Sequence, residues 1–110
     1  MANKYIDVAV EKSSDCIDEE MSWKIESFMK VYDKCLNTYI AKNLDYGDSF
    51  SKLYRKFGLI STVIRLSDKI NRLESLVNGE RQVEDESIHD TLEDIINYCT
   101  MTLMEKDTDD

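Results

Sequence analysis

Three acidic side chains near the C-terminus are spaced so that they could hold a cation together. Glu86, Asp90 and Asp94 follow one another at intervals of four residues. On an α-helix each such step turns the side chain by only about 40°, so the three carboxylates share one stripe. Carboxylates suit a hard cation such as Mg²⁺, which takes one or two of them and keeps its other positions for water and phosphate oxygens. This acidic stripe therefore predicts either a metal site or a solvated face.

The solvated alternative rests on the position of the stripe, which lies opposite the apolar face of its own helix together with Asn97. Two observations favour the metal site. Like charges four residues apart repel one another, and no Lys or Arg lies between Glu86 and Asp94 to relieve them. Asp94 also lies too far along the helix to gain from the dipole at its start. The spacing alone leaves both interpretations open.

A basic cluster is predicted on the preceding long helix. Arg65, Lys69 and Arg72 are spaced four and three residues apart, on one flank of an apolar seam. Arg can grip a phosphate with two parallel hydrogen bonds, and Lys serves as a point charge. Because Asp68 is a neighbour, a salt-bridged or solvated flank is the alternative to a phosphate site.

A third candidate is the turn around Gly47. Asp45 and Asp48 bracket this turn, and Tyr46 lies between them. The two acids could supply further oxygen ligands, and the aromatic ring could stack on a base. They could equally be ordinary turn and capping residues. The motif is weak when it is taken alone.

The remaining reactive side chains predict little chemistry. His89, the single histidine, lies off the stripe and is expected at a surface or interface. Cys16, Cys35 and Cys99 are an odd number with no CxxC spacing, which predicts reduced thiols and no zinc cluster.

The elements that must position these residues are four amphipathic helices. Apolar residues at helical spacing predict them at about 17–42, 49–56, 59–78 and 86–105. There is no proline and there are only three glycines, so helix breakers are few. The third helix carries a seam that alternates four and three residues apart: Leu59, Val63, Leu66, Ile70, Leu73 and Val77. The prediction is an all-α fold, a small bundle of three long helices and one short helix, completed by oligomerisation.

One domain is expected, from residue 17 to 105, between a flexible segment at 1–16 and an acidic tail at 106–110. The net charge of −9 argues against binding to nucleic-acid polymers or anionic membranes. No apolar stretch is long enough to cross a bilayer, and the N-terminus lacks the pattern of a signal peptide. The expected location is the cytoplasm.

Taken together, three blocks resemble the nucleotide modification associated domain 1 family of bacteria and phages. They are Lys42–Phe50, Arg65–Leu73 and Asp85–Tyr98, and the resemblance covers about Phe28 to Leu103. More distantly the pattern is similar to the all-α nucleoside triphosphate pyrophosphatases of the MazG-like superfamily. Those enzymes hold Mg²⁺ with acids on helices, within dimers or tetramers. The resemblance implies a cytoplasmic protein of a bacterium or a phage-infected host.

The resemblance implies roles for ten residues. Metal ligands for Mg²⁺, or for Mn²⁺, would be Glu86, Asp90, Asp45 and Asp48. Contacts to the nucleotide would come from Arg65, Lys69, Arg72, Lys42 and Tyr46. Asp94 would orient the water that attacks the phosphate. The implied function is Mg²⁺-dependent nucleotide binding, with pyrophosphohydrolysis of canonical or modified nucleoside triphosphates.

Two alternatives stay open beside this enzyme. The first helix has no clear copy of the ExxE block of the MazG-like pattern, and the last helix reads ExxxDxxxD rather than ExxD. A protein that sequesters nucleotides without cleaving them needs the pocket but not this chemistry. The other alternative is a structural or interaction bundle without a small ligand. A homodimer or homotetramer is expected from the apolar surface of the first and third helices.

Overall fold

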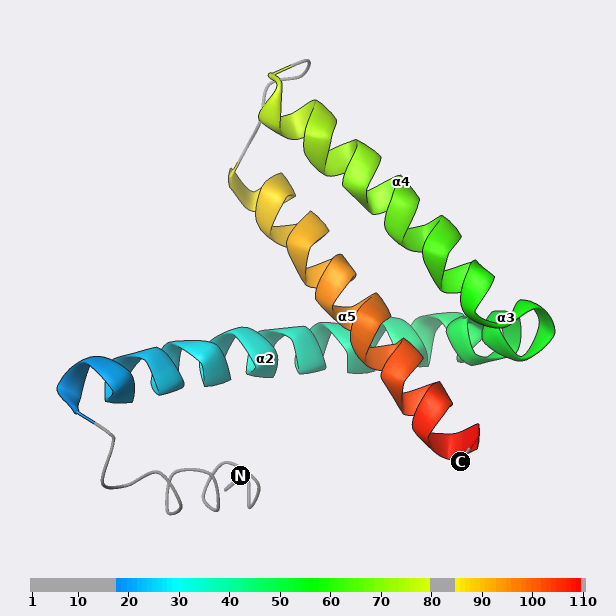
Figure 1. The fold of residues 1–110 in the computed structure, drawn as a ribbon, viewed down its shortest axis with the longest axis horizontal. Coiled ribbons are helices and arrows are strands. Elements are labelled where there is room, and N and C mark those ends of the chain that lie inside the picture. Colours follow the sequence, from blue (N-terminus) through cyan, green and yellow to red (C-terminus); the bar gives the residue numbers. More distant parts are fainter. Residues whose placement is uncertain (1–17, 80–84, 110) are drawn as a thin grey trace. The chain divides into compact units, whose positions relative to one another are not determined.

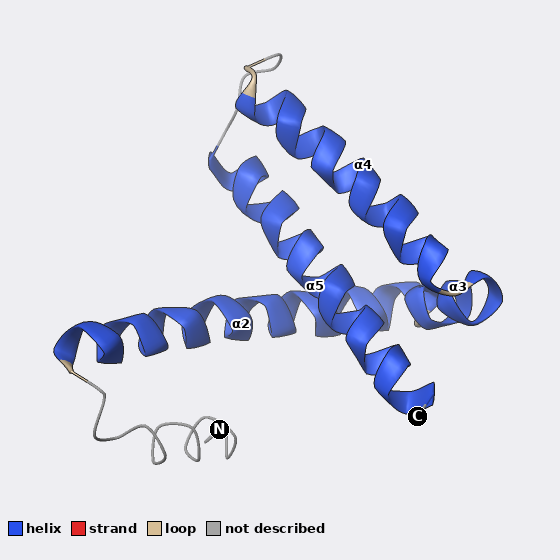
Figure 2. Ribbon diagram, in the orientation of Figure 1, coloured by secondary structure: helices blue, strands red, loops and turns tan. Residues whose placement is uncertain are grey.

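A computed structural model describes residues 18–79 and 85–109 (Figure 1), apart from the side chains of Tyr46, Asp85, Glu86 and Asp109. These residues form four helices and no strand (Figure 2): α2 (Glu19–Tyr46), α3 (Ser49–Phe57), α4 (Leu59–Val77) and α5 (Asp85–Asp109). The prediction of an all-α bundle is confirmed. No helix in this part of the chain combines the length and apolar character that crossing a bilayer requires. The predicted flexible segment at 1–16 and residues 80–84 lie outside the described residues.

The described residues divide into two compact units, 18–34 and 35–109. The first unit is the N-terminal part of α2. Its start is capped, because Asp18 Oδ1 accepts a hydrogen bond of 2.8 Å from the backbone N–H of Met21. Glu20 pairs with Lys24 at 3.1 Å, and the rings of Phe28 and Tyr32 stack with centroids 4.9 Å apart. These contacts between neighbouring turns support the helix locally.

Helix α2 ends at Tyr46, four residues beyond the predicted end at Lys42. No glycine or proline interrupts the chain between Lys42 and Gly47, so the helix continues to that glycine. The N–H of Gly47 bonds to the carbonyl of Asn43 at 3.0 Å, and Gly47 and Asp48 both adopt positive φ, 61° and 58°. Asp48 makes no side-chain capping bond to α3. The turn between α2 and α3 is therefore shorter than predicted, and it is formed by backbone conformation without a side-chain cap.

Helix α5 continues four residues beyond its predicted end at Glu105. The hydroxyl of Thr108 donates to the carbonyl of Met104 at 2.8 Å, and Lys106 lies in the last turn, where a positive charge complements the helix dipole. The acidic tail is thus helical as far as Asp109.

In the second unit α4 and α5 lie side by side and antiparallel (Figure 1). Two hydrogen bonds set their register. Thr62 on α4 donates to Thr102 on α5 at 2.8 Å, because the Thr102 hydroxyl donates to its own helix at the carbonyl of Tyr98. Further along, Arg72 Nε donates to the hydroxyl of Thr91 at 3.3 Å. Helix α3 packs against both helices, and Ser51 donates to Glu105.

Hydroxyl groups occupy much of the buried space of this unit. The buried apolar side chains are Cys35, Phe50, Tyr54 and Leu76, and the buried polar ones are Ser61, Thr62, Thr91 and Thr102. Most of the predicted seam on α4 is exposed instead, at Leu59, Val63, Ile70 and Val77. The seam is therefore not the face that α4 turns to α5. Thr62 lies on that face, and its hydroxyl meets the cost of burial by its hydrogen bond to Thr102. The predicted homo-oligomer, which would use this surface, stays a prediction.

Replacing Thr62 by valine is expected to lower the free energy of unfolding by about 1 kcal/mol, because it removes a buried hydrogen bond at almost constant volume. Chemical denaturation monitored by circular dichroism measures this. Thr100→Val is the control, since its exposed hydroxyl bonds only to the carbonyl of Ile96 in its own helix. An equal loss in both variants would show that the bond between Thr62 and Thr102 contributes nothing specific.

Candidate functional site

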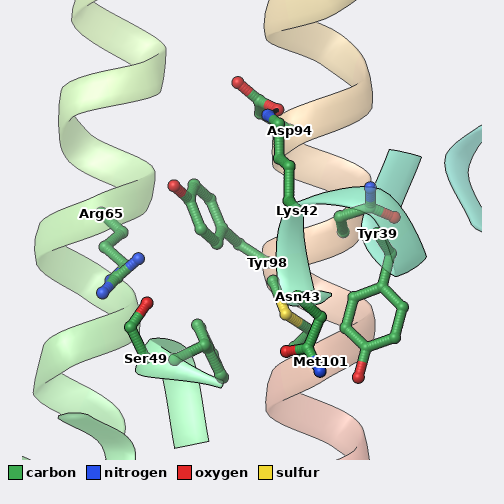
Figure 3. A pocket seen from close by; sticks show the side chains of 10 residues that line it. Tyr39, Lys42, Asn43, Ser49, Arg65, Asp94, Tyr98 and Met101 are labelled. Atoms are coloured by element: carbon green, nitrogen blue, oxygen red, sulfur yellow. Dashed lines mark hydrogen bonds and ion pairs between the residues drawn. The ribbon is translucent and has the colours of Figure 1, made fainter. Parts of the chain in front are cut away.

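A single carboxylate joins three helices of the second unit. Asp94 on α5 is 18% exposed at its side chain, and both of its oxygens are paired. Oδ1 lies 2.9 Å from Lys42 Nζ on α2, and Oδ2 lies 2.9 Å from Lys69 Nζ on α4. Figure 3 shows Lys42 extending to Asp94. The C-terminal end of the acidic stripe thus meets two ammonium groups.

These neighbours change the acidity of Asp94. Burial disfavours the charged carboxylate and acts to raise its pKa, but hydrogen bonds and charges from Lys69 and Lys42 outweigh burial. The pKa of Asp94 is held below its ordinary value as a result. The group is therefore a firmly ionised counter-ion at neutral pH.

Beside Asp94 lies a pocket of about 280 Å³. Side chains from all four helices meet around it (Figure 3). Its lining combines basic, amide, hydroxyl and aromatic groups: Tyr39, Lys42, Asn43, Ser49, Phe50, Arg65, Asp94, Asn97, Tyr98 and Met101. Basic groups next to amides and rings are the donors and surfaces that a phosphorylated aromatic ligand needs.

Arg65 is positioned in this pocket by two aromatic rings. Its guanidinium carbon lies 5.5 Å from the centroid of Phe50 and 5.4 Å from that of Tyr98. The two rings are themselves nearly parallel, with centroids 6.1 Å apart and an interplanar angle of 19°. A guanidinium is attracted to ring faces and stacks on them, which limits its freedom to move. Arg65 is thus held in place before any ligand arrives.

Asn97 shows why the stripe is not simply a solvated face. Its Nδ2 donates at 3.1 Å to the carbonyl of Cys35 on α2. Asp94 and Asn97 are both partly buried, whereas Asp90 is exposed. The prediction of a solvated face is therefore wrong for the C-terminal half of the stripe, because α5 is contacted by α2 as well as by α4.

The structure gathers some of the predicted site residues and separates others. Lys42 and Arg65 line the pocket. Lys69 does not line it but forms an ion pair with Asp94, which does. Arg72 bonds to Thr91 and is not among the lining residues. The side chain of Tyr46 lies outside the described part of the chain.

The predicted carboxylate set for a metal does not converge in the described residues. No three or more His, Cys, Asp or Glu side chains there lie together as metal ligands do. Asp45 and Asp90 are exposed, and Asp94 faces ammonium groups that would repel a dication. Since the side chain of Glu86 is not described, the metal-ligand role of Glu86, Asp90, Asp45 and Asp48 stays a prediction, as does the catalytic role of Asp94.

Sequence reasoning missed the aromatic and amide part of the pocket. Phe50 and Tyr98 lie in two of the blocks that carry the family resemblance, and Asn97 was placed on the face of the acidic stripe without a role. The signal that could have identified these residues is their position in the sequence: Phe50 follows Ser49 directly, and Asn97 and Tyr98 lie one helical turn after Asp94. The contact of Arg65 with both rings depends on the packing of α3 against α4 and α5, which no spacing reveals.

A family model, nucleotide modification associated domain 1, matches residues 42–105, which is more than half of the chain. The chain belongs to the nucleotide modification associated domain 1 family. The match includes every pocket-lining residue of this family member except Tyr39. No curated protein and no solved structure matches the chain. The match concerns nucleotide modification associated domain 1 alone, so the likeness to MazG-like pyrophosphatases remains an expectation.

Proposed function

We propose that the pocket binds a nucleotide. The observation that carries this proposal is the meeting of two basic side chains, Lys42 and Arg65, with aromatic rings and two amides in one pocket. The name of the family refers to nucleotide modification, which agrees with such a ligand.

The phosphate end of the ligand would be held by Arg65 and Lys42. Arg65 presents a planar fork of N–H donors that matches phosphate oxygens, and its stacking on Phe50 and Tyr98 lowers the entropy lost on binding. Lys42 adds a second positive charge beside Arg65 in the lining of the pocket.

The nucleoside end would be held by rings and amides. Tyr39 and Tyr98 offer aromatic surface, which tolerates any base because every base has a flat face. Asn43 and Asn97 offer amide groups that can read the edge of a base. The bond from Asn97 to the Cys35 carbonyl fixes that amide and leaves its oxygen as an acceptor.

Binding is supported further than hydrolysis by the described residues. Asp94 has both oxygens committed to lysines, and the described carboxylates do not form a cation site by themselves. The predicted Mg²⁺-dependent hydrolysis is therefore a separate question from binding. To test it, the protein is incubated with nucleotides and Mg²⁺, and chromatography then shows whether the nucleotides have been cleaved.

Replacing Arg65 by glutamine is expected to weaken nucleotide binding at least tenfold, because it removes a charged donor worth about 1.5 to 3 kcal/mol. Isothermal titration calorimetry with a panel of ribonucleotides and deoxyribonucleotides measures this. Arg55→Gln is the matched control, since it removes the same charge from an exposed position on α3. Equal affinities of both variants, or no binding by the wild type at millimolar concentration, would reject the proposal.

A further inference from the structure

One side of the antiparallel pair of α4 and α5 is apolar and exposed. Its side chains come from the predicted seam of α4 and from a second line on α5: Leu92, Ile95, Cys99 and Leu103. None of these side chains is buried, and exposed fractions of 43 to 69% are found at Leu59, Val63, Ile70, Val77, Leu92 and Leu103. We propose that this side, here called the apolar face, forms a homodimer by packing on the same face of a second copy of the chain.

On α4 the apolar face lies beside the residues that contact α5. These contacts are made by Thr62, Arg65, Lys69 and Arg72. Each of the four is followed directly by a residue of the seam: Val63, Leu66, Ile70 and Leu73. One position along a helix turns the side chain by about 100° around the axis. The seam is therefore turned about a quarter of a circle away from α5.

The same relation holds on α5. Its contacts with α4 are made by Thr91, Asp94, Tyr98 and Thr102. The residues that follow them directly are Leu92, Ile95, Cys99 and Leu103. Because both helices are right-handed and run antiparallel, one position along either helix turns the side chain toward the same side of the pair. The two lines therefore form one surface.

The nucleotide pocket lies on the other side of the pair. Asn97 and Met101 line the pocket and precede Tyr98 and Thr102 by one position, so their side chains are turned the opposite way. Asn97 meets α2 there, at the carbonyl of Cys35. The apolar face shares no residue with the pocket lining. A dimer formed through it leaves the pocket open, and the inference does not rest on nucleotide binding.

The charge of the chain favours contact through this face. The apolar face contains no charged side chain, although 34% of the residues in the chain are charged. Homodimer interfaces are likewise depleted in charge at their core. Two copies that each carry a net charge of −9 repel one another, so they approach most readily where both surfaces are uncharged.

The order of residue types in the seam favours two copies. Leucine recurs every seven residues at Leu59, Leu66 and Leu73, and β-branched side chains do so at Val63, Ile70 and Val77. In coiled coils, β-branched residues at one core position with leucine at the other favour two-stranded assembly. A second copy presents the same seam, as the two-fold symmetry of a homodimer requires.

The size of the face is sufficient for a stable dimer. Helix α4 has 19 residues and is therefore about 28 Å long. Two helices side by side are about 20 Å wide, so the face covers roughly 560 Å² in each copy and roughly 1,100 Å² in both. A specific interface needs about 1,000 Å² in total.

The first test is the molar mass in solution, measured by light scattering over a range of protein concentrations. The wild type is expected at twice the chain mass of 12.8 kDa. Ile70→Glu and Leu103→Glu each place a charge in the interface and should halve this mass, because burying an unpaired charge is costly. Leu44→Glu is the matched control, since it makes the same change at a leucine on α2 that is 80% exposed, and it should stay dimeric. Circular dichroism checks that each variant is folded.

The second test uses the thiol of Cys99, which lies on the apolar face and is exposed in the single chain. The wild type is treated with iodoacetamide, and mass spectrometry of the peptide that contains Cys99 follows the reaction. Alkylation should become slower as the protein concentration rises, because the second copy covers the thiol. In Ile70→Glu the rate should be fast at every concentration.

A wild type that is monomeric at all concentrations overturns the proposal, as does an oligomer that neither Ile70→Glu nor Leu103→Glu dissociates. Protection of Cys99 in a monomer overturns it as well, because another part of the same chain then covers the face. If the two variants do not fold, the wild type decides. A dimer whose Cys99 is protected in a concentration-dependent way supports the proposal, and a dimer whose Cys99 reacts freely overturns it.

Discussion

Replacing Phe50 by alanine is expected to lower the free energy of unfolding by about 3 to 5 kcal/mol, the range for removing a buried aromatic side chain. Phe50 is 6% exposed, and its ring stacks on Tyr54 and Tyr98 at centroid distances of 6.4 and 6.1 Å. The second unit buries few apolar side chains, so one ring is a large share of its core. Thermal and chemical denaturation followed by circular dichroism measure the loss.

Phe57→Ala is the matched control, because it truncates the same residue type in the same helix at a position that is 61% exposed. Its expected effect is below about 0.5 kcal/mol. Similar losses in the two variants would contradict the central position of Phe50 in the core. Phe50→Leu keeps most of the apolar volume but removes the ring under Arg65. Its loss of free energy of nucleotide binding should therefore be larger than its loss of free energy of unfolding.

The second large effect is a loss of stability in acid that depends on Asp94. Its pKa is lower in the folded protein than in the unfolded chain, so its contribution to stability is fully present above the unfolded pKa and is lost as the pH falls through the folded pKa. The affected window therefore lies below about pH 4. At neutral pH, Asp94→Leu should cost about 1 to 3 kcal/mol, between the effects of breaking an exposed and a buried ion pair.

Denaturation curves of the wild type and Asp94→Leu at a series of pH values check this. The difference between their free energies of unfolding should be constant from neutral pH down to the unfolded pKa and should shrink below it. Asp68→Leu is the control, since Asp68 is exposed on α4. A difference between wild type and Asp94→Leu that does not change with pH would show that the ion pairs with Lys42 and Lys69 do not stabilise the fold.

The helices themselves were predictable from the sequence because their cause is local. Apolar periodicity and the scarcity of helix breakers predicted all four helices, and the start of α4 at Leu59 was predicted correctly. The ends of α2 and α5 were predicted four residues too early, at Lys42 and Glu105. The polar residues in the last turn of each of these helices were interpreted as the end of the helix. A helix that ends in water is also polar in its last turn, so polarity does not mark the end.

The site was harder to predict because it depends on which faces meet. The spacing of Arg65 and Lys69 placed them on one flank of α4, but their partners lie on other helices. Asp94 was grouped with Glu86 and Asp90 by its spacing, yet it is bonded to lysines 52 and 25 residues away in the chain. Helical periodicity describes one helix and contains no information on the neighbour that covers it.

The interface between α4 and α5 has a thermodynamic consequence. Thr62, Thr91 and Thr102 fill positions where most bundles place hydrocarbon, so unfolding hydrates comparatively little apolar surface there. Exposure of apolar surface raises the heat capacity of the unfolded state, and exposure of polar surface lowers it. The stability of this interface therefore varies gently with temperature, and cooling weakens it less than it would weaken an interface of leucines.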